Sequence, residues 1–408
     1  MQDLKKILNN CKDILLLGLI AIPIGVAVGA IDTLFGKVLL EVNNIRNNNV
    51  FRLIPFLPLA GVLITYTYSK IGKNSIKGMA LIFSAGFKEE DNIPLRLIPL
   101  AMVSTWLTHL FGGSAGREGV AVQIGGTVGH SIGKRLNIKN SSKILLIAGM
   151  SAGFAGLFLT PMAAAFFAME VFTAGIVEYC ALFPCITAAL SASFISRLLG
   201  LGKTGVNLNC SLDLDIPLIL KLVLLGILFG IIGGLFAYIL NFTGKFLAEH
   251  ISDPILRVFI MGCILSVLLL LLHHGRYAGS GSNLIEASFS KGKIYEYDWL
   301  LKFLLTVLTM SIGFQGGELV PLFSIGASLG AVISPILRLP SELASALGYV
   351  AVFGSATNTI LAPVFIGGEI FGFDYLPYFF IVSAIAYVFN GNKSIYTAQR
   401  LSADLKLN

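Results

Sequence analysis

Long apolar runs follow one another along almost the whole chain, and short polar loops between them hold most of the charged residues. Because roughly 20 apolar residues in a helix span the hydrocarbon core of a bilayer, this length allows on the order of ten to fifteen spanning or re-entrant helices. We therefore predict an all-α, multi-pass membrane protein. The apolar runs occupy about residues 14–42, 51–71, 95–112, 119–134, 143–175, 178–200, 216–248, 255–273, 298–313, 319–338, 345–371 and 374–390.

The composition agrees with this pattern and excludes several other classes of protein. Of the 408 residues, 55% are hydrophobic and only 12% are charged, whereas soluble domains carry about a quarter charged residues. The apolar content is too high for a disordered chain, and the sequence has no short period or cysteine framework. A collagen, a coiled coil and a small disulfide scaffold are therefore excluded as well. The net charge of +7 suits anionic lipid headgroups or an anionic solute. The Lys and Arg residues are scattered and form no basic stripe, so no nucleic-acid partner is expected.

The N-terminal segment predicts the orientation of the chain. Lys5, Lys6 and Lys12 precede the first apolar run, which has no small-residue cleavage site and is too long for a signal peptide. It is therefore expected to be a membrane helix that stays in the protein. The positive-inside rule then places the N-terminus in the cytoplasm. We expect a protein of the cell membrane with both termini on the cytoplasmic side.

Two segments that lie far apart in the chain resemble each other. Residues 116–129 (GREGVAVQIGGTVG) correspond to residues 316–330 (GGELVPLFSIGASLG), with one residue inserted in the second copy, and residues 159–172 echo residues 361–371. We therefore predict a single transmembrane domain over residues 1–408, with half-repeats at about 13–205 and 215–405. Weakly similar halves with interrupted apolar segments are typical of inverted-repeat transporters, whose substrate binds between the ends of half-helices.

Ionisable side chains inside apolar runs are costly in a membrane, so each is a candidate functional residue. Glu118 lies between Gly116 and Gly119, immediately before the regular apolar run that begins at Val120. This position predicts a helix N-terminus, where unpaired amides bind anions. A carboxylate there can occupy the anion site and leave when it is protonated or displaced, which would couple a proton to an anion. The alternative is a capping carboxylate that never moves.

Four further charged residues follow the same logic. Glu318 occupies the equivalent position in the second half, before Pro321, a residue favoured in the first turn of a helix. It either assists the same pathway or caps the helix. Glu170 and Glu369 lie at matched positions near the ends of apolar runs, which favours a structural hydrogen-bonding role for both. Arg117 is expected to pair with a buried acid.

The motifs of soluble enzymes and metalloproteins are absent from the sequence or incomplete in it. The five cysteines include no C-x-x-C pair, and the five histidines include no H-E-x-x-H motif. Residues 202–204 resemble the end of a phosphate-binding loop, but Arg197 stands where its first glycine is required, and residues 279–284 lack the third glycine of a dinucleotide loop. We expect no cofactor and no metal, and a secondary active transporter rather than an enzyme.

Residues 116–125 and 313–327, with their Gly-Arg-Glu-Gly and Gly-Gly-Glu motifs, resemble the CLC family of anion channels and transporters. The resemblance covers nearly the whole chain, with both half-repeats in order. It implies a homodimer with a separate pore in each subunit, an anion site built from helix N-termini, and Glu118 as the gating glutamate. Only residues 397–408 follow the last motif, so we expect no cytoplasmic nucleotide-binding domains of the kind found in eukaryotic members.

Departures from the common family pattern narrow the resemblance. Met79 stands where chloride-selective members have a serine, and Val171 stands where chloride/proton exchangers have an internal proton acceptor. Together with Gly-Gly-Glu at 316–318 and the segment 391–396 (GNKSIY), Met79 resembles the fluoride/proton antiporter branch, which makes Tyr396 the pore tyrosine. That branch often has threonine where this chain has Val320.

The same branch places phenylalanines near the gating glutamate, for which Phe83 and Phe87 are the candidates. The resemblance thus implies a proton-coupled fluoride exporter that exchanges cytoplasmic fluoride for external protons. A chloride channel or chloride/proton exchanger of the same fold is the alternative, and an intramembrane enzyme or structural membrane protein is a remote one. Glu118 would gate the pathway and carry the proton. The anion site would be lined by Met79, Tyr396, Gly116, Gly119, Glu318, Val320 and Phe83.

Overall fold

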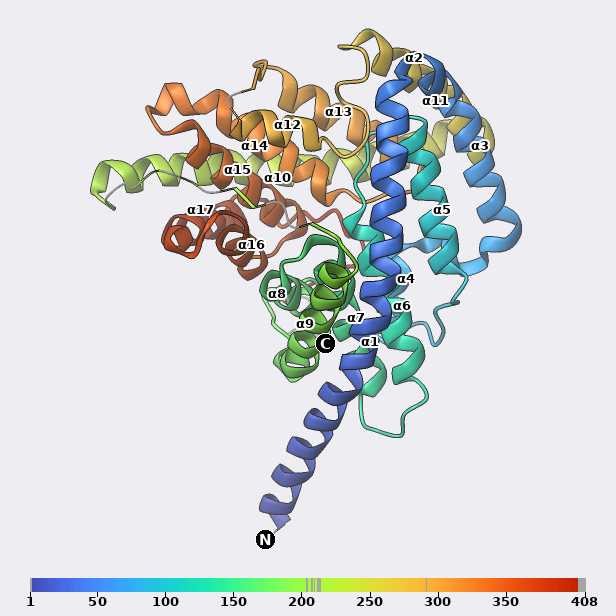
Figure 1. Ribbon diagram of the computed structural model, residues 1–408, viewed down its shortest axis with the longest axis vertical. Helices are drawn as coiled ribbons and strands as arrows, with labels where there is room; N and C mark the ends of the chain where they lie inside the picture. The colour runs from blue at the N-terminus through green and yellow to red at the C-terminus, as the bar shows by residue number, and fades with distance from the viewer. Residues whose placement is uncertain are drawn as a thin grey trace.

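A computed structural model shows a predominantly α-helical protein (Figure 1). It describes residues 2–202, 205–206, 208, 210, 214–290 and 292–402, with side chains from residue 11 onward. The side chains of Lys5 and Lys6, which contribute to the predicted orientation, and the whole of Lys203 lie outside the described residues. Within them, the only sheet is a two-stranded parallel pair, β1 (Thr173–Ala174) with β2 (Arg400–Leu401).

Helices α1 to α9 form the first part of the chain, and helices α10 to α17 form the second. The first set is α1 (Gln2–Asn48), α2 (Val50–Leu53), α3 (Leu57–Thr67), α4 (Met79–Gly86), α5 (Leu97–Leu110), α6 (Glu118–Gly133), α7 (Ser141–Phe158), α8 (Pro161–Glu170) and α9 (Leu182–Leu198). The second set is α10 (Ile216–His250), α11 (Pro254–Leu271), α12 (Ser282–Phe289), α13 (Asp298–Ser311), α14 (Leu319–Leu337), α15 (Ser341–Thr357), α16 (Leu361–Phe371) and α17 (Leu376–Val388).

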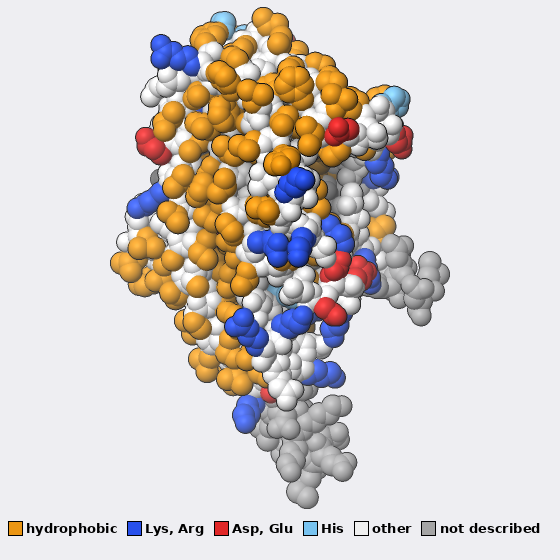
Figure 2. Space-filling view, turned by 90° about the vertical axis from the view of Figure 1, so that its right-hand side faces the viewer, with side chains coloured by type: hydrophobic (Ala, Val, Ile, Leu, Met, Phe, Trp, Pro, Cys, Tyr) orange, Lys and Arg blue, Asp and Glu red, His pale blue; other side chains and the backbone are white. Residues whose placement is uncertain are grey.

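The lengths and surfaces of the helices confirm the predicted membrane class. Among the described residues, seven helical segments are long and apolar enough to cross a bilayer. Others are too short, since the ten residues of α8 and the eleven of α16 rise only about 1.5 Å per residue. Figure 2 shows hydrophobic side chains over a broad, continuous part of one face, whereas most charged side chains lie over its lower right part. The long segments are Cys11–Asn48, Val50–Gly86, Ser141–Phe158, Tyr179–Leu198, Ile216–His250, Pro254–Leu271 and Leu319–Leu337.

Glycines allow α6 to lie directly against the backbone of α7. A Cβ built on Gly125 would lie 2.0 Å from the carbonyl oxygen of Gly149, and one on Gly129 would lie 1.9 Å from that of Leu145. The pair α14 and α15 repeats this contact, because a Cβ on Gly326 would lie 2.0 Å from the carbonyl oxygen of Gly348. Such close packing is how small residues hold membrane helices together. It fixes the positions of the α6 and α14 N-termini.

Helices α8 and α16 cap each other through their acidic residues. Glu170, the last residue of α8, accepts hydrogen bonds from the amides that begin α16, with N···O distances of 2.6 Å from Ile360 and 3.0 Å from Leu361. Glu369 of α16 accepts in return from the amides of Met162 and Ala163 at the start of α8, at 3.2 and 2.9 Å. The predicted structural role of both glutamates is therefore confirmed. Each carboxylate satisfies amides that a helix N-terminus leaves unpaired.

Candidate anion pathway

The segments that precede α6 and α14 meet, although they lie about 200 positions apart in the chain. Gly116 and Gly317 form an antiparallel bridge, with N···O distances of 2.5 Å from Gly116 to Gly317 and 2.9 Å in the reverse direction. A Cβ built on Gly119 would lie 3.3 Å from the Cα of Gly317. Only residues without large side chains permit this approach. The bridge therefore brings the N-termini of two helices to one place.

Glu118 is the first residue of α6 and is fully buried, so the prediction that it begins a helix is confirmed. Its Oε2 accepts from the backbone amide of Arg117 at 3.2 Å, and its Oε1 lies 3.3 Å from Nε of the same arginine. The buried acid that Arg117 was expected to pair with is thus its own neighbour. Glu118 sits among the amides of the helix start, where an anion is stabilised.

Glu318 is the N-cap residue of α14, and Pro321 lies in the first turn of that helix, as predicted. The side chain of Glu318 is half-buried and borders a cavity of about 300 Å³. Met79, Phe83, Gly119 and Tyr396 line the same cavity. Five of the residues expected at the anion site are therefore brought together. Gly116, Glu118 and Val320 are buried and do not line the cavity.

A third helix N-terminus faces this cavity. Met79 begins α4, and Gly78 before it has φ of +51°, a conformation in which a residue with Cβ is strained. Gly78 and Met79 both line the cavity, together with Gly119 from α6 and Glu318 from α14. Each helix start carries a partial positive charge of roughly half an electron. The cavity therefore favours an anion without needing a buried cationic side chain in its wall.

Tyr396 closes one side of the cavity, with its hydroxyl buried and without a hydrogen-bond partner among the described residues. Its ring centroid lies 5.3 Å from that of Phe83, which lies 5.0 Å from that of Phe172. Phe87 does not line the cavity: it contacts Phe172 on one side, and the guanidinium of Arg400 lies 4.1 Å from its ring centroid. Of the two candidate phenylalanines, only Phe83 reaches the cavity.

The segment after Tyr396 is anchored to the rest of the protein, and this anchoring holds the tyrosine in place. Gln399 donates from Nε2 to the carbonyl oxygens of Val171, at 2.8 Å, and Thr357, at 3.0 Å. Strand β2 pairs with β1, and Arg400 forms an ion pair with Glu89 at 2.5 Å. The segment that follows Tyr396 is therefore fixed by contacts with other parts of the protein.

Lys302 of α13, which sequence reasoning missed, supports the loop in front of α6. Its ammonium group is fully buried and donates to the carbonyl oxygen of Gly279 at 2.6 Å, to that of Tyr277 at 3.2 Å, and to the Ser114 hydroxyl at 2.8 Å. Ser114 lies two residues before Gly116. Lys302 therefore holds in place the chain segment that leads to Glu118. It is an ionisable residue in an apolar run, the same signal that identified Glu118.

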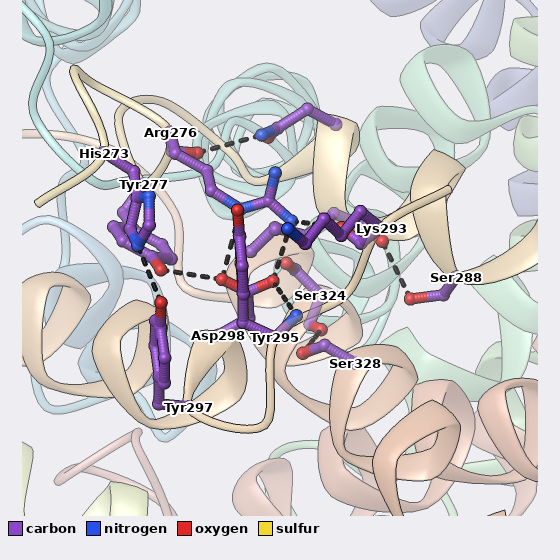
Figure 3. Close-up of polar contacts among 12 residues, drawn as sticks. His273, Arg276, Tyr277, Ser288, Lys293, Tyr295, Tyr297, Asp298, Ser324 and Ser328 are labelled. Atoms are coloured by element: carbon purple, nitrogen blue, oxygen red, sulfur yellow. Dashed lines mark hydrogen bonds and ion pairs between the residues drawn. The ribbon is translucent and has the colours of Figure 1, made fainter. Parts of the chain in front are cut away.

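Asp298 lies one turn before Lys302 on α13, and Figure 3 shows its polar contacts. Its fully buried carboxylate accepts from two nitrogens of Arg276, at 3.1 and 2.7 Å, and from the hydroxyl of Tyr277 at 2.7 Å. The amide of Tyr295 donates to it at 2.9 Å. The hydrogen bonds between Arg276 and Asp298 raise the pKa of Arg276 above its ordinary value. Asp298 therefore holds Arg276, Tyr277 and Tyr295 together. It does not line the cavity.

Asp32 of α1 was also missed. Its carboxylate is fully buried, and neither oxygen has a hydrogen-bond partner among the described residues. It faces α7, since a Cβ built on Gly156 would lie 2.7 Å from its Oδ2. Asp32 does not line the cavity described above.

Comparison with known proteins agrees with this geometry. The family model described as voltage gated chloride channel matches residues 60–391. A "Chloride/fluoride channel protein" of Pseudomonas syringae pv. tomato is 35% identical over 352 residues, which cover 85% of this chain and 78% of the relative. An uncharacterized protein of Methanocaldococcus jannaschii is 26% identical over 361 residues, covering 87% of this chain and 88% of that protein.

Solved structures share the whole architecture. The crystal structure of a CLC-type fluoride/proton antiporter is 51% identical, with a TM-score of 0.93 over 95% of this chain and 98% of the other. A slow cyanobacterial Cl⁻/H⁺ antiporter shares the fold at 19% identity, with a TM-score of 0.75 over 95% of this chain and 96% of the other. The inverted-repeat fold expected from the sequence is thus the observed one, and the chain belongs to the CLC family of anion channels and transporters.

Proposed function

We propose that this protein is a proton-coupled fluoride exporter, which exchanges cytoplasmic fluoride for external protons. The observation that carries the proposal is the cavity where the N-termini of α4, α6 and α14 converge beside Met79 and Tyr396. The names of two relatives support it: one structure is titled a CLC-type fluoride/proton antiporter, and one protein is named a chloride/fluoride channel protein.

The walls of the cavity suit fluoride better than chloride. Fluoride is smaller and more strongly hydrated, so a selective site must replace its hydration shell with closely spaced donors. The Tyr396 hydroxyl and the amides at the helix starts are such donors, whereas the thioether of Met79 supplies none where chloride-selective relatives have a hydroxyl. Phe83 and Met310 add apolar surface to the wall. The larger, less basic chloride gains less from these few strong donors.

Glu118 is the proposed proton carrier. As a carboxylate it competes with fluoride for the amides at the start of α6, and it is held there by Arg117 at 3.3 Å. Protonation removes its charge, so the attraction to Arg117 weakens and the amides become available to fluoride. Glu318, which borders the cavity, is proposed to assist the same pathway. Because Val171 is not acidic, no proton is routed through that position.

We further propose that the protein is a homodimer in the lipid bilayer, formed by one membrane domain per subunit with half-repeats at about 13–205 and 215–405. Both termini would lie in the cytoplasm. The outer face of α9 supports an apolar contact with lipid or a second copy, because Phe194 and Leu198 are 66% and 70% exposed. Each subunit carries its own cavity, so each would transport independently.

A flux assay with purified protein in liposomes tests the proposal. Fluoride release, followed with a fluoride electrode, should be much faster than chloride release, and an inward proton gradient should drive fluoride against its own gradient. Glu118→Gln keeps the side-chain volume but removes the titratable group, so proton-coupled transport should stop. The variant should elute like the unmodified protein in gel filtration.

The alternative is a passive chloride or fluoride channel, which the name of the Pseudomonas relative and Val171 both favour. Equal fluoride and chloride fluxes, or fluoride movement that is insensitive to the proton gradient, would establish that alternative. If Glu118→Gln moves protons at the wild-type rate, Glu118 is not the proton carrier.

A further inference from the structure

Gln123 is a polar side chain in the wall of the cavity, and it has no role in the mechanism proposed above. It lies on α6 one turn after Gly119, and both residues line the cavity. The residue is only 8% exposed. Within the described part of the chain, its side-chain carboxamide makes no hydrogen bond, although its backbone carbonyl accepts one from Thr127 at 2.7 Å. The carboxamide is open to the cavity, where its N–H groups are available to a solute.

The carboxamide of Gln123 lies beside the start of α4. A Cβ built on Gly78 would lie 3.7 Å from Oε1 of Gln123 and 3.8 Å from Nε2. Gly78 is the N-cap of α4, so the amides of the first turn of that helix face the same space. One ion in this space can therefore be reached by a side-chain N–H from α6 and by a helix N-terminus from α4.

Two further polar side chains line the same cavity, one of them exposed. Lys77 lines the cavity next to Gly78, and its ammonium group pairs with Glu90 at 2.6 Å. Gln315, half-buried in the segment before α14, lines the cavity as well. Lys77, Gly78 and Gln123 therefore border the same space.

We infer that Gln123 is a fluoride ligand: its carboxamide N–H donates to a fluoride ion that is held at the same time by the N-terminus of α4. The inference deepens the proposed function and rests on it. A carboxamide suits this task because it donates without carrying a charge, so the ion is bound but not trapped. Because the carboxamide is neutral, Gln123 does not compete with fluoride for the helix N-terminus, as a carboxylate would.

Fluoride uptake and binding by matched variants test this role. Gln123→Met has nearly the same length and removes both N–H donors, so the KM for fluoride should rise about tenfold, as expected for the loss of about 1.4 kcal/mol of binding. Gln123→Glu presents only acceptors to the anion and should raise KM further. Gln123→Asn keeps the donors on a shorter side chain and should recover part of the affinity. Calorimetric titration of the detergent-solubilised protein with sodium fluoride should give the same order of affinities.

Thr127→Val is the matched control, because it removes one buried polar group a turn further along α6, outside the cavity. It should keep the wild-type KM for fluoride. If Gln123→Met elutes abnormally in gel filtration, the KM values of Gln123→Asn and Gln123→Glu for fluoride are compared instead. A wild-type KM in Gln123→Met or Gln123→Glu would overturn the inference and leave the proposed function intact. Absence of proton-coupled fluoride transport in the unmodified protein would instead overturn the proposed function, and this inference with it.

Discussion

The reciprocal caps between α8 and α16 make a quantitative stability prediction. The carboxylate of Glu170 accepts four contacts from the amides of Ile360, Leu361 and Ala362, at 2.6 to 3.2 Å. Glu170→Gln replaces one acceptor oxygen by an NH₂ group that faces these amides. Because a hydrogen bond to a charged group contributes about 1.5–3 kcal/mol, the loss of one or two of them should lower the free energy of unfolding by about 3 kcal/mol.

The measurement is unfolding of the detergent-solubilised protein by increasing mole fraction of a denaturing detergent, followed by circular dichroism. Glu369→Gln should be destabilising in the same way, since Glu369 accepts from Met162 and Ala163. Glu178→Gln is the control: its ion pair with Lys143 is partly exposed, with 25% and 22% of the two side chains accessible, and such a pair contributes less than about 1 kcal/mol. If Glu170→Gln is no more destabilising than Glu178→Gln, the caps do not support the junction between α8 and α16.

Three further changes test other parts of the structure. Gly125→Ala should lower the melting temperature, because its Cβ would lie 2.0 Å from the Gly149 carbonyl oxygen. A Cβ at Gly244 meets no described atom within 4 Å, so Gly244→Ala should not lower the melting temperature in the same measurement. Lys302→Met leaves the Ser114 loop unsupported, so the maximal rate of fluoride release from liposomes should fall, and an unchanged rate would contradict this. Met79→Ser adds a hydroxyl to the cavity wall and should raise chloride flux relative to fluoride.

The sequence alone determined the properties that depend on local pattern. Apolar runs with few charges set the membrane class, since no other environment accommodates them. The starts of α6 at Glu118 and of α14 after Glu318 followed from the glycines and proline around them. The matched positions of Glu170 and Glu369 predicted their structural role. Each of these inferences needs only neighbours in sequence or a comparison of two similar segments.

Only the tertiary structure decided which groups share the cavity. Gly116 pairs with Gly317 and Phe83 meets Tyr396 across about 200 and 300 positions, and no local pattern encodes such contacts. Phe83 and Phe87 are equally apolar in sequence, yet packing turns one to the cavity and the other to Arg400. Gln123 shows the same limit. Its unpaired amide becomes visible only when α4 is placed beside α6, because the face of a buried helix that borders a cavity is set by its neighbours.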